Sequence, residues 1–484
     1  MTEEKISAKR IVISALLFLI GFVALIEIIF LMLIVNNGLN VFDYVKSQFN
    51  SLVLLAISLS ILTVITYLYF YFENKQILNK VSKIFEIFLI LYVALILSYL
   101  IGKFINPNAR PLAFLAMMAV TLIGRRDAIF FNVIFALMQF LIDRFSGISV
   151  ITEVESFACL LVTFCSGTLS IFIFQYVKTR LQCVLLTFLI LLPTEIIIAL
   201  MELIYSTNNV TLQSTFTLLM YGGLDAVFST LLYLFVLPVV EMVFSELTVF
   251  RLRELTSDDA KLIKRLKNNA PGTYNHSVVV AQLVEVCARA IGEDSELARA
   301  AAYYHDMGKL KNPEMFTENQ TDYNFHNEIT PELSVDIIRS HAKDGATLIK
   351  KNHLPEFFAD IAIQHHGTMP IKYFYAKALK MSDGELNIEN YSYSGPTPTS
   401  KIAAIIMIVD ASEAAARSLI DHSPEAVEAL VRSLIEERVD LDQFENCNIT
   451  MRELTIIKHT IVSQLTGVYH SRVSYPKIKI SKKK

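Results

Sequence analysis

The sequence YYHDMGK, at residues 303–309, decides how the second half of this chain folds and what chemistry it can hold. It closes an alanine-rich segment with helical spacing, and Gly308 favours a helix stop directly after the pair His305-Asp306. Imidazole nitrogens and carboxylate oxygens bind hard or borderline divalent metals. Helical scaffolds build such sites by projecting ligands inward from several facing helices. The pair therefore predicts further ligands on neighbouring helices.

Histidines and one further aspartate flank this pair in a defined order. All ten histidines of the chain lie after residue 275, which places the chemistry in this half. Asp410 lies inside the apolar run 402–410, where a carboxylate is costly to bury without a partner such as a metal. Each residue alone is weak evidence, but the ordered series is specific. The candidate metal ligands are His276, His305, Asp306, His341, His365, His366 and Asp410.

This set can serve one metal or two. Four ligands complete one site, whereas seven residues with one shared carboxylate fit a pair of metals. The remaining histidines fall outside the series, and we expect surface or structural roles for them. His326 is the best exception, because it lies in a loop between two ligand-bearing helices. The others are His353, His422, His459 and His470.

The C-terminal half is predicted to be entirely helical. Alanine, leucine, isoleucine and glutamate recur at helical spacing, and the strict alternation of a half-buried strand is scarce. In this arrangement His276 opens the first helix, and His365-His366 closes the fourth just before Gly367. The predicted helices cover residues 276–291, 295–307, 331–351, 355–366, 399–420, 423–437 and 450–469.

The N-terminal half has the composition of a membrane domain. Mean hydropathy of the whole chain is +0.48, and 54% of the residues are hydrophobic, with the surplus before residue 247. Runs of this length span a bilayer as helices. We therefore predict an all-α protein with about eight transmembrane helices, in contact with membrane lipid. The apolar segments are 11–35, 51–72, 84–101, 111–123, 128–143, 157–177, 181–205 and 217–247.

Two of these segments, 111–123 and 128–143, are short and form either two full spans or a re-entrant hairpin. Positive charges in the loops set the orientation. Lysine and arginine gather before the first segment and after the second, fourth and sixth, and the alternate loops are poorer in them. Both termini are therefore predicted to be cytoplasmic, in a multi-pass protein of the cell membrane. The clustered charges are Lys5, Lys9, Arg10, Lys75, Lys80, Lys83, Arg125, Arg126, Lys178 and Arg180.

The composition shift divides the chain into four parts. Residues 1–50 hold the first span and a short external loop, and 51–247 form the polytopic domain. Residues 248–270 read as a connector helix with a break near 256–258, ended by Pro271-Gly272. Residues 271–484 form the domain that carries the metal ligands.

Charge and cysteine content exclude other classes. The net charge of −3 gives no global basic field for duplex nucleic acid. The five cysteines include no CxxC pair, so a zinc ribbon or a disulfide framework is not expected. A few acids lie within the apolar segments, where an ionisable group is a functional hypothesis by default. These acids are Glu27, Glu195, Glu202 and Asp225.

The ligand series resembles that of a known enzyme class. His276, His305-Asp306 and Asp410 match the signature of HD-domain phosphohydrolases, and the other three histidines match the extra ligands of the binuclear members. The neighbouring motifs narrow the match to the seven-transmembrane HD-domain family of cyclic di-AMP phosphodiesterases (PgpH type). These motifs are APGTYNHS at 270–277, YYHDMGK at 303–309, ENQ at 318–320, SHAKDG at 340–345, QHHGT at 364–368, DASEAAARS at 410–418 and YHSR at 469–472.

The resemblance implies a metal-dependent enzyme that hydrolyses cyclic di-AMP to linear pApA. Asp306 would bridge two divalent metals, manganese or iron, and would act with His305 and Lys309 in catalysis. His276, His305 and Asp410 would complete one metal site, and His341, His365 and His366 the other. Lys309 and Arg417 would contact phosphate, a role that suits the bidentate geometry of arginine.

Three features depart from the family. Only residues 36–50 stand where the family carries a large extracellular domain. The substrate-loop segment reads YSGPTP at 393–398, and Asn275 precedes the first ligand where the family has histidine.

Three other readings stay open. The first is an HD phosphohydrolase for another nucleotide, such as cyclic di-GMP, although no Gly-Tyr-Pro motif follows His366. The second is a catalytically silent nucleotide receptor, against which the complete ligand set argues. The third is a transporter with a regulatory domain, which rests only on the spans and their acids. A homodimer is compatible with each of them.

Overall fold

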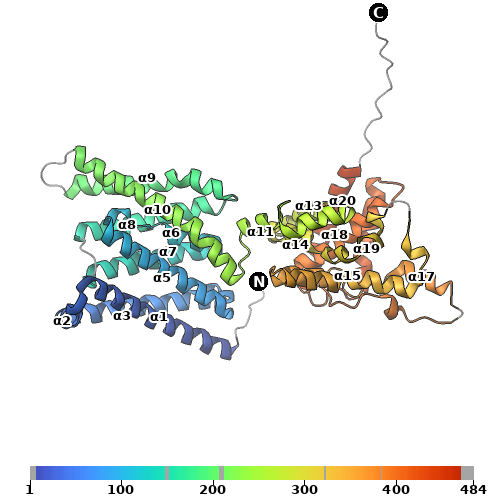
Figure 1. Cartoon of the computed structure of the whole chain (residues 1–484), viewed down its shortest axis with the longest axis horizontal. Coiled ribbons are helices and arrows are strands. Elements are labelled where there is room, and N and C mark those ends of the chain that lie inside the picture. The colour runs from blue at the N-terminus through green and yellow to red at the C-terminus, as the bar shows by residue number, and fades with distance from the viewer. Residues whose placement is uncertain (1–6, 148–151, 206–211, 321–322, 383, 470–484) are drawn as a thin grey trace, which may run out of the picture. The chain divides into compact units, whose positions relative to one another are not determined.

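The computed structural model describes residues 7–147, 152–205, 212–320, 323–382 and 384–469. The chain divides into two compact units, Met1–Phe250 and Arg251–Lys484. Across these described ranges the regular elements are all helices, apart from an isolated bridge between Pro370 and Ser392. The all-α prediction is therefore confirmed (Figure 1).

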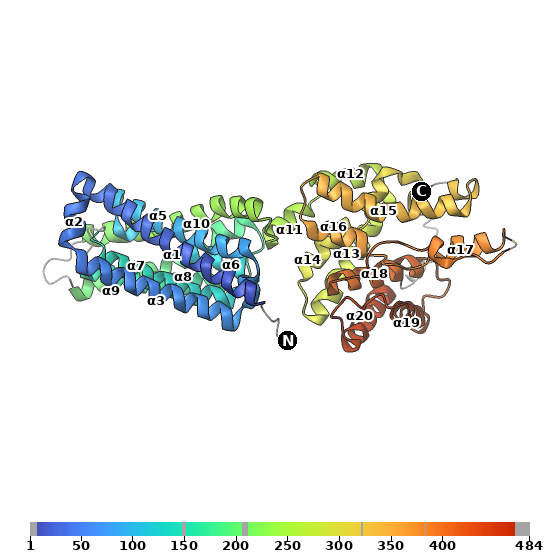
Figure 2. The same cartoon turned by 90° about the horizontal axis from the view of Figure 1, so that it is seen from below.

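The first unit is a bundle of long apolar helices that run side by side (Figures 1 and 2). Seven helices within the described residues are long and apolar enough to cross a membrane. They match seven of the eight predicted segments, so the multi-pass prediction holds. The α-helices of this unit include these seven and three shorter ones, α2, α4 and α6. They are α1 Ala8–Asn37, α2 Val41–Ser47, α3 Phe49–Glu73, α4 Lys75–Asn79, α5 Val81–Phe104, α6 Phe114–Ile123, α7 Arg125–Phe145, α8 Glu153–Phe174, α9 Arg180–Tyr205 and α10 Leu212–Phe244.

The fourth predicted segment differs from the others because α6 has only 10 residues. A 3-10 turn at Pro107–Ala109 and a non-helical stretch to Ala113 precede it. At the end of α5, Lys103 Nζ donates to the carbonyl of Val35 near the end of α1. At the start of α7, Asp127 accepts from Asn74 just after α3, at the opposite end of the bundle. The irregular stretch and α6 together therefore run the length of the bundle, as a crossing that is only partly helical.

Buried polar groups stabilise this partly helical crossing. Backbone groups at membrane depth must find partners inside the protein. The backbone N–H of Leu112 donates to Asp225 Oδ1 on α10 at 2.9 Å. The side chain of Arg110, 2% exposed, pairs with Asp143 on α7 at 2.7 Å. Asp225 and Asp143 therefore both stabilise the irregular segment that precedes α6.

Two short helices lead from the bundle into the second unit, within the connector predicted at 248–270. They are α11 Val249–Leu255 and α12 Lys261–Asn269. The predicted break near 256–258 is confirmed, and a further break lies at Ser245, whose φ is +56°. The connector ends where we predicted, because α12 stops at Asn269 with Ala270 as its C-cap, and Pro271-Gly272 then begins the next helix. The fixed φ of proline suits the first helical position, where its missing N–H costs no hydrogen bond.

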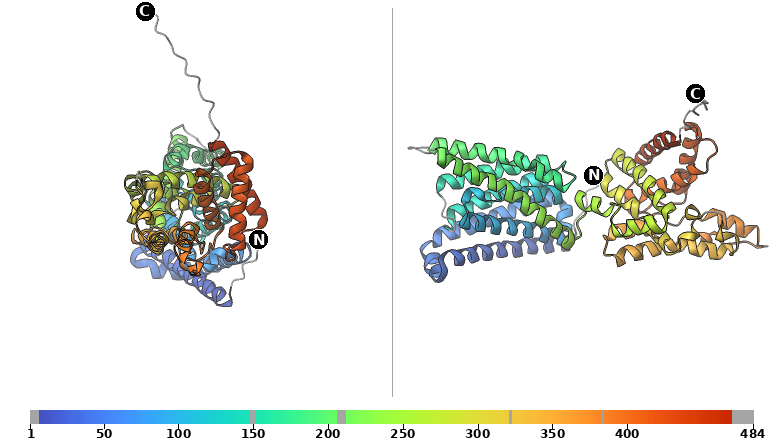
Figure 3. Two further views of the ribbon diagram at one scale, coloured as in Figure 1. Left: turned by 90° about the vertical axis from the view of Figure 1, so that its right-hand side faces the viewer. Right: turned by 45° about the horizontal axis from the view of Figure 1, so that its top comes forward.

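The second unit is a helical domain built around α13 (Figure 3). Helix α13 packs against α14, α18 and α20. Helix α17 and a run of short 3-10 turns between 307 and 327 were not predicted. The helices are α13 Pro271–Ile291, α14 Ser295–Tyr304, α15 Pro331–Lys351, α16 Glu356–Gln364, α17 Lys372–Leu379, α18 Lys401–Arg417, α19 Pro424–Asp440 and α20 Met451–Tyr469.

Candidate metal centre

Five helices of the second unit bring the seven predicted ligands together. Helices α13, α15 and α18 carry His276, His341 and Asp410 within their length. The other four follow directly after α14 and α16, where the chain leaves the helix. Asp410 directly follows eight buried residues of α18, at 402–409, so its carboxylate is buried together with that apolar run. His366 is half-buried and the other six ligands are buried.

One group of ligands forms at the inner face of α13. His276, His305 and Asp410 offer donor atoms that lie within 4.8 Å of one another. His276 Nε2 lies 2.9 Å from Asp410 Oδ1, and His305 Nε2 lies 3.7 Å from the same oxygen. This is a compact set of two nitrogens and one oxygen.

A second group forms beside the first from α15 and the end of α16. His341, His365 and His366 also offer donor atoms within 4.8 Å of one another. The Nε2 atoms of His341 and His365 are 3.3 Å apart. Two neutral imidazole nitrogens repel at this distance unless a proton or a cation lies between them, so the arrangement suits a metal.

Asp306 lies between the two groups and directs one oxygen toward each. Its Oδ2 is 3.2 Å from His305 Nε2 and 3.8 Å from His276 Nε2. Its Oδ1 is 3.3 Å from His341 Nε2 and 3.7 Å from His365 Nε2. A carboxylate in this position can serve two cations at once.

Three buried donor atoms lack a hydrogen bond of good geometry, although Lys309 forms an ion pair with Asp306, and such unsatisfied atoms are the test for a metal site. Neither carboxylate oxygen of Asp306 accepts a hydrogen bond of good geometry within the described part of the chain, and the same holds for His305 Nε2. Buried polar atoms are otherwise almost always hydrogen-bonded. These residues therefore fit a cation that would take up their free lone pairs.

Outer hydrogen bonds fix which ring nitrogen faces the centre. The Nδ1 atoms of His305 and His365 donate to the carbonyls of Ala302 and Ala362, at 2.6 and 2.9 Å. Carbonyl oxygens only accept, so each Nδ1 carries its proton and each Nε2 is left as the inward ligand. His341 bonds in the same way to the carbonyl of Ile338.

For His276 the outer partner is a carboxylate, Glu413, which lies 2.7 Å from Nδ1. Such carboxylate–histidine pairs raise the basicity of a metal ligand and hold its ring in place. Glu413 lies one turn after Asp410 on α18 and is buried. We did not single out Glu413 from the sequence, although its i+3 spacing from a ligand on one helix face was the available signal.

The charges of the centre are strongly coupled without a cation. Burial alone would raise the pKa of Asp306, but His305 and Lys309 hold it well below its usual range. Burial alone would lower the pKa of His305, yet Asp306 and Asp410 raise it to about 10. The same balance, with Asp410 and Glu413, raises the pKa of His276 to about 9. Two carboxylates thus attract positive charge here, which protons supply when a metal does not.

Lys309 and Arg417 stand at the rim of the centre, where each has an acidic neighbour. Lys309 Nζ lies 2.7 Å from Asp306 Oδ2 and 2.9 Å from Glu318. Arg417 is half-exposed and pairs with Glu413. Both side chains line a cavity of about 770 Å³ that opens onto His276, His341, His366 and Asp410. A small-molecule site has this size.

Tyr393 and His326 also line this cavity. The Tyr393 ring stacks on His366 with centroids 4.2 Å apart. His326 Nε2 lies 2.7 Å from the carbonyl of Met315 and belongs to none of the ligand groups. His326, the exception that we singled out from the sequence, therefore lies at the cavity without joining either ligand group. His470 and Arg472 lie outside the described residues.

The fold and the order of the ligands define an HD domain that follows a polytopic membrane domain in the sequence. The family model described as "HD domain" matches residues 273–415. The model described as "7TM receptor with intracellular HD hydrolase" matches residues 49–248. The chain belongs to this seven-transmembrane HD family.

Curated relatives agree over both units. "Cyclic-di-AMP phosphodiesterase PgpH" of Listeria monocytogenes serotype 1/2a (strain 10403S) is 39% identical over 373 residues, which is 76% of this chain and 50% of the relative. The protein of the same name in Bacillus subtilis (strain 168) is 39% identical over 59% of this chain and 41% of its own length. The chain thus spans about half the length of the curated relatives it matches. A crystal structure of the L. monocytogenes PgpH HD domain in complex with cyclic di-AMP is 46% identical, with a TM-score of 0.42, over 44% of this chain and 99% of that one.

Proposed function

We propose that this protein is a membrane-bound, metal-dependent phosphodiesterase that hydrolyses cyclic di-AMP to linear pApA. The observation that carries the proposal is the position of Asp306, whose two oxygens face two separate histidine groups. The names of two relatives at 39% identity support the substrate. Hydrolysis adds water across one P–O3′ bond of the cyclic dinucleotide, so the first product is linear.

We propose two divalent cations, manganese or iron, as the cofactors. His276, His305 and Asp410 would hold one, His341, His365 and His366 the other, and Asp306 both. A pair of such ions lowers the pKa of a water and neutralises the phosphate charge. His305 and His365 are prepared for this, because their Nδ1 protons are bonded outward and their Nε2 lone pairs point inward.

The rim residues are proposed to bind the substrate. Lys309 lies within hydrogen-bond range of Asp306 and Glu318, so a small rotation would carry its ammonium from a carboxylate to a phosphate oxygen. Arg417 is half-exposed in the same cavity and could take the second phosphate through two of its N–H groups. The stacked ring of Tyr393 offers an aromatic wall beside the proposed cations.

The placement in the cell is also a proposal. We propose that the first span within residues 1–50 and the polytopic domain 51–247 lie in the cell membrane with the N-terminus in the cytoplasm. Residues 248–270 would form the connector, and 271–484 the catalytic domain in the cytoplasm. Lysines and arginines cluster at one end of the bundle, next to Glu73 and Asp127. That end is expected to face the cytoplasm.

Hydrolysis of cyclic di-AMP and cyclic di-GMP by the purified full chain, supplied with manganese or iron, tests the proposal. We expect conversion of cyclic di-AMP to pApA with little action on cyclic di-GMP. The double variant H305A/D306A should lose this activity, whereas His459→Ala, which changes an exposed histidine on α20, should keep it. Faster hydrolysis of another nucleotide would show that cyclic di-AMP is not the preferred substrate. Turnover by the double variant would overturn the site.

A further inference from the structure

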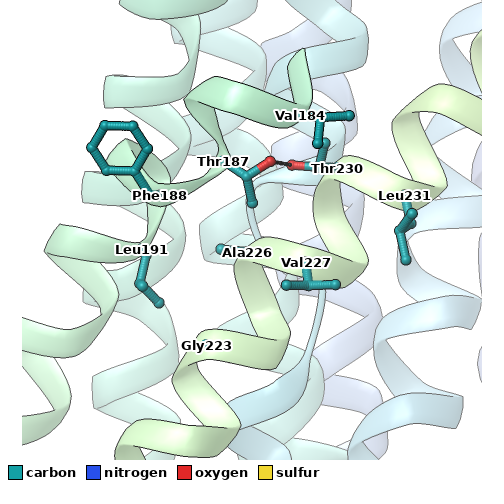
Figure 4. Close-up of a pocket in the computed structure, with 9 residues that line it drawn as sticks. All are labelled: Val184, Thr187, Phe188, Leu191, Gly223, Ala226, Val227, Thr230 and Leu231. Atoms are coloured by element: carbon teal, nitrogen blue, oxygen red, sulfur yellow. Dashed lines mark hydrogen bonds between the residues drawn. The ribbon is translucent and has the colours of Figure 1, made fainter. Parts of the chain in front are cut away.

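Two cavities of this protein differ in the polar groups that border them. The groove between α9 and α10 has a volume of about 360 Å³ and is apolar apart from Thr187 and Thr230, which hydrogen-bond to each other (Figure 4). These lining residues therefore show no feature that selects a particular ligand. The cavity at the metal centre is instead bordered by His366, a ligand whose own side-chain contacts do not explain how it is oriented.

His366 is the exception among the five histidine ligands. Each of the other four has an outer hydrogen-bond partner at its ring Nδ1. Within the described part of the chain the ring of His366 makes no such bond, and its Nδ1 lies 3.8 Å from Asp410 Oδ2. Outer partners normally orient a metal-bound imidazole. The orientation of His366 must therefore come from the backbone that carries it and from the packing of its ring.

Gln443 holds the backbone directly after this ligand. Its side chain is 1% exposed, and it follows the end of α19. Its Oε1 accepts from the backbone N–H of Thr368 at 3.0 Å, and its Nε2 donates to Thr368 Oγ1 at 2.9 Å and to the carbonyl of Leu441 at 2.7 Å. Because an N–H only donates and a carbonyl only accepts, the amide can have only this orientation. We call the bonds between Gln443 and Thr368 the amide clamp.

Gly367 lies between the ligand and the amide clamp and leaves the space that the clamp needs. Its φ of +52° is a left-handed conformation that glycine adopts readily. A Cβ added there would overlap Gln443 Oε1 and would lie 2.9 Å from Met407 Cε. A side chain at this position would therefore displace the glutamine amide.

The other side of the same loop is held by a neighbouring segment of the chain. The N–H of Ile371 donates to the carbonyl of Tyr391 at 2.8 Å, and the N–H of Tyr393 donates to the carbonyl of Met369 at 3.0 Å. The ring of Tyr393 also stacks on His366, with an angle of 23° between the ring planes. A stacked ring and a backbone fixed on both sides thus stand where the other histidines have a hydrogen bond.

We propose that Gln443 is a positioning residue of the metal centre, which sets the place of His366 through the backbone of Thr368. The inference rests on the two-cation centre of the proposed function. It assigns Gln443 to only one of the two sites, the one that His366 shares with His341 and His365. Loss of the amide clamp should therefore loosen one cation and leave the other in place.

Glu413 provides the comparison, because it serves the other ligand group. It lies 2.7 Å from the Nδ1 of His276. Since Gln443 and Glu413 act on different groups, each single change should loosen one cation, and the double change should loosen both. If the two residues acted on the same site, the double variant would still hold one cation tightly.

The test measures metal release from the purified full chain in detergent, loaded with manganese and dialysed against graded concentrations of a chelator. The parent protein should retain two manganese ions per chain. Gln443→Met keeps the length of the side chain and removes its hydrogen bonds. It should release one ion at about tenfold lower chelator concentration, the scale for the loss of an outer partner. The double variant E413A/Q443M should release both ions early.

Three further variants sharpen the test. Gln443→Glu keeps an acceptor for the N–H of Thr368 and should lose less affinity than Gln443→Met. Gly367→Ala should release the same ion early, because its methyl group displaces the amide. Gln282→Met makes the matched change at an exposed position of α13 and should retain both ions as the parent does.

Three results would overturn the inference. Gln443→Met could release manganese as the parent does, it could release both ions together through a general loss of stability, or the double variant could keep one ion tightly bound. A parent chain that retains fewer than two ions would overturn the two-cation centre itself, and this inference with it. That result is read from the parent alone, so the two failures are distinguishable.

Discussion

In the membrane unit the buried charge of Arg110 is met by Asp143 at 2.7 Å, and Asp225 accepts three hydrogen bonds. In the second unit Asp306 and His305 are equally buried, yet their inward atoms accept no hydrogen bond of good geometry within the described ranges. Both arrangements bury charge, which is costly in either setting. The difference separates charged groups that stabilise the fold from groups that can bind a ligand. Changing the first kind should lower stability, and changing the second kind should lower metal binding and hydrolysis.

The largest effect is expected at the shared carboxylate. Asp306→Ala removes the group that faces both histidine sets, so metal content and hydrolysis should both fall. We expect at least about a thousandfold loss of hydrolysis, the scale for losing a group that acts on the transition state. Circular dichroism should show an unchanged helix content, because Asp306 follows the end of α14 and is not part of a helix. Activity and metal content that survive together would contradict its place between two cations.

The next largest effect is on stability, in the other unit. Arg110→Met leaves Asp143 buried without its cation, and breaking one side of a buried pair costs about 3–5 kcal/mol. We expect low yield and early thermal unfolding in detergent.

The double change R110M/D143L removes both charges and should recover part of this loss. A single variant as stable as the parent would show that the pair does not hold the irregular segment before α6.

Much of the metal centre could be predicted from the sequence because its ligands are chemically distinctive. Histidine pairs at helix ends and an aspartate in an apolar helix have few structural explanations, and the order of the series added specificity. Glu413 was missed because a glutamate on a helix has an ordinary explanation as a surface residue. Its role becomes visible only when α13 and α18 pack and bring it 2.7 Å from His276.

The membrane bundle was predictable in outline for a different reason. Apolar composition reports depth in the bilayer, and it does not report whether the backbone stays helical. Segment 111–123 was therefore predicted as an apolar segment that forms either a full span or part of a re-entrant hairpin, and its helix begins only at Phe114. The irregular backbone is tolerated because Asp225 supplies the acceptor for Leu112, and that pairing links residues 113 positions apart. No local pattern carries such information.

A smaller effect is expected at the outer carboxylate of the metal centre. Glu413→Ala removes the acceptor for His276 Nδ1 and the partner of Arg417. Losses of this kind weaken metal binding by about 10- to 100-fold, which competition with a chelator would measure. Glu413→Gln keeps an acceptor and should lose less. Glu436→Ala, which changes an exposed glutamate on α19, should bind metal as the parent does, and a Glu413→Ala protein that matched it would remove Glu413 from the site.

The smallest effect separates a shared hydrogen bond from a lone one. Thr194→Val removes one of the three donors to Asp225 and a bond with Ser166, and it keeps the side-chain shape. Because two donors remain, we expect a loss of only about 1 kcal/mol, seen as a small fall in the unfolding temperature in detergent. Thr217→Val, on an exposed position of α10, should change nothing. A loss as large as that of Arg110→Met would mean that the two remaining donors do not satisfy Asp225, and that its hydrogen bond from Thr194 stabilises the bundle as strongly as the Arg110–Asp143 pair does.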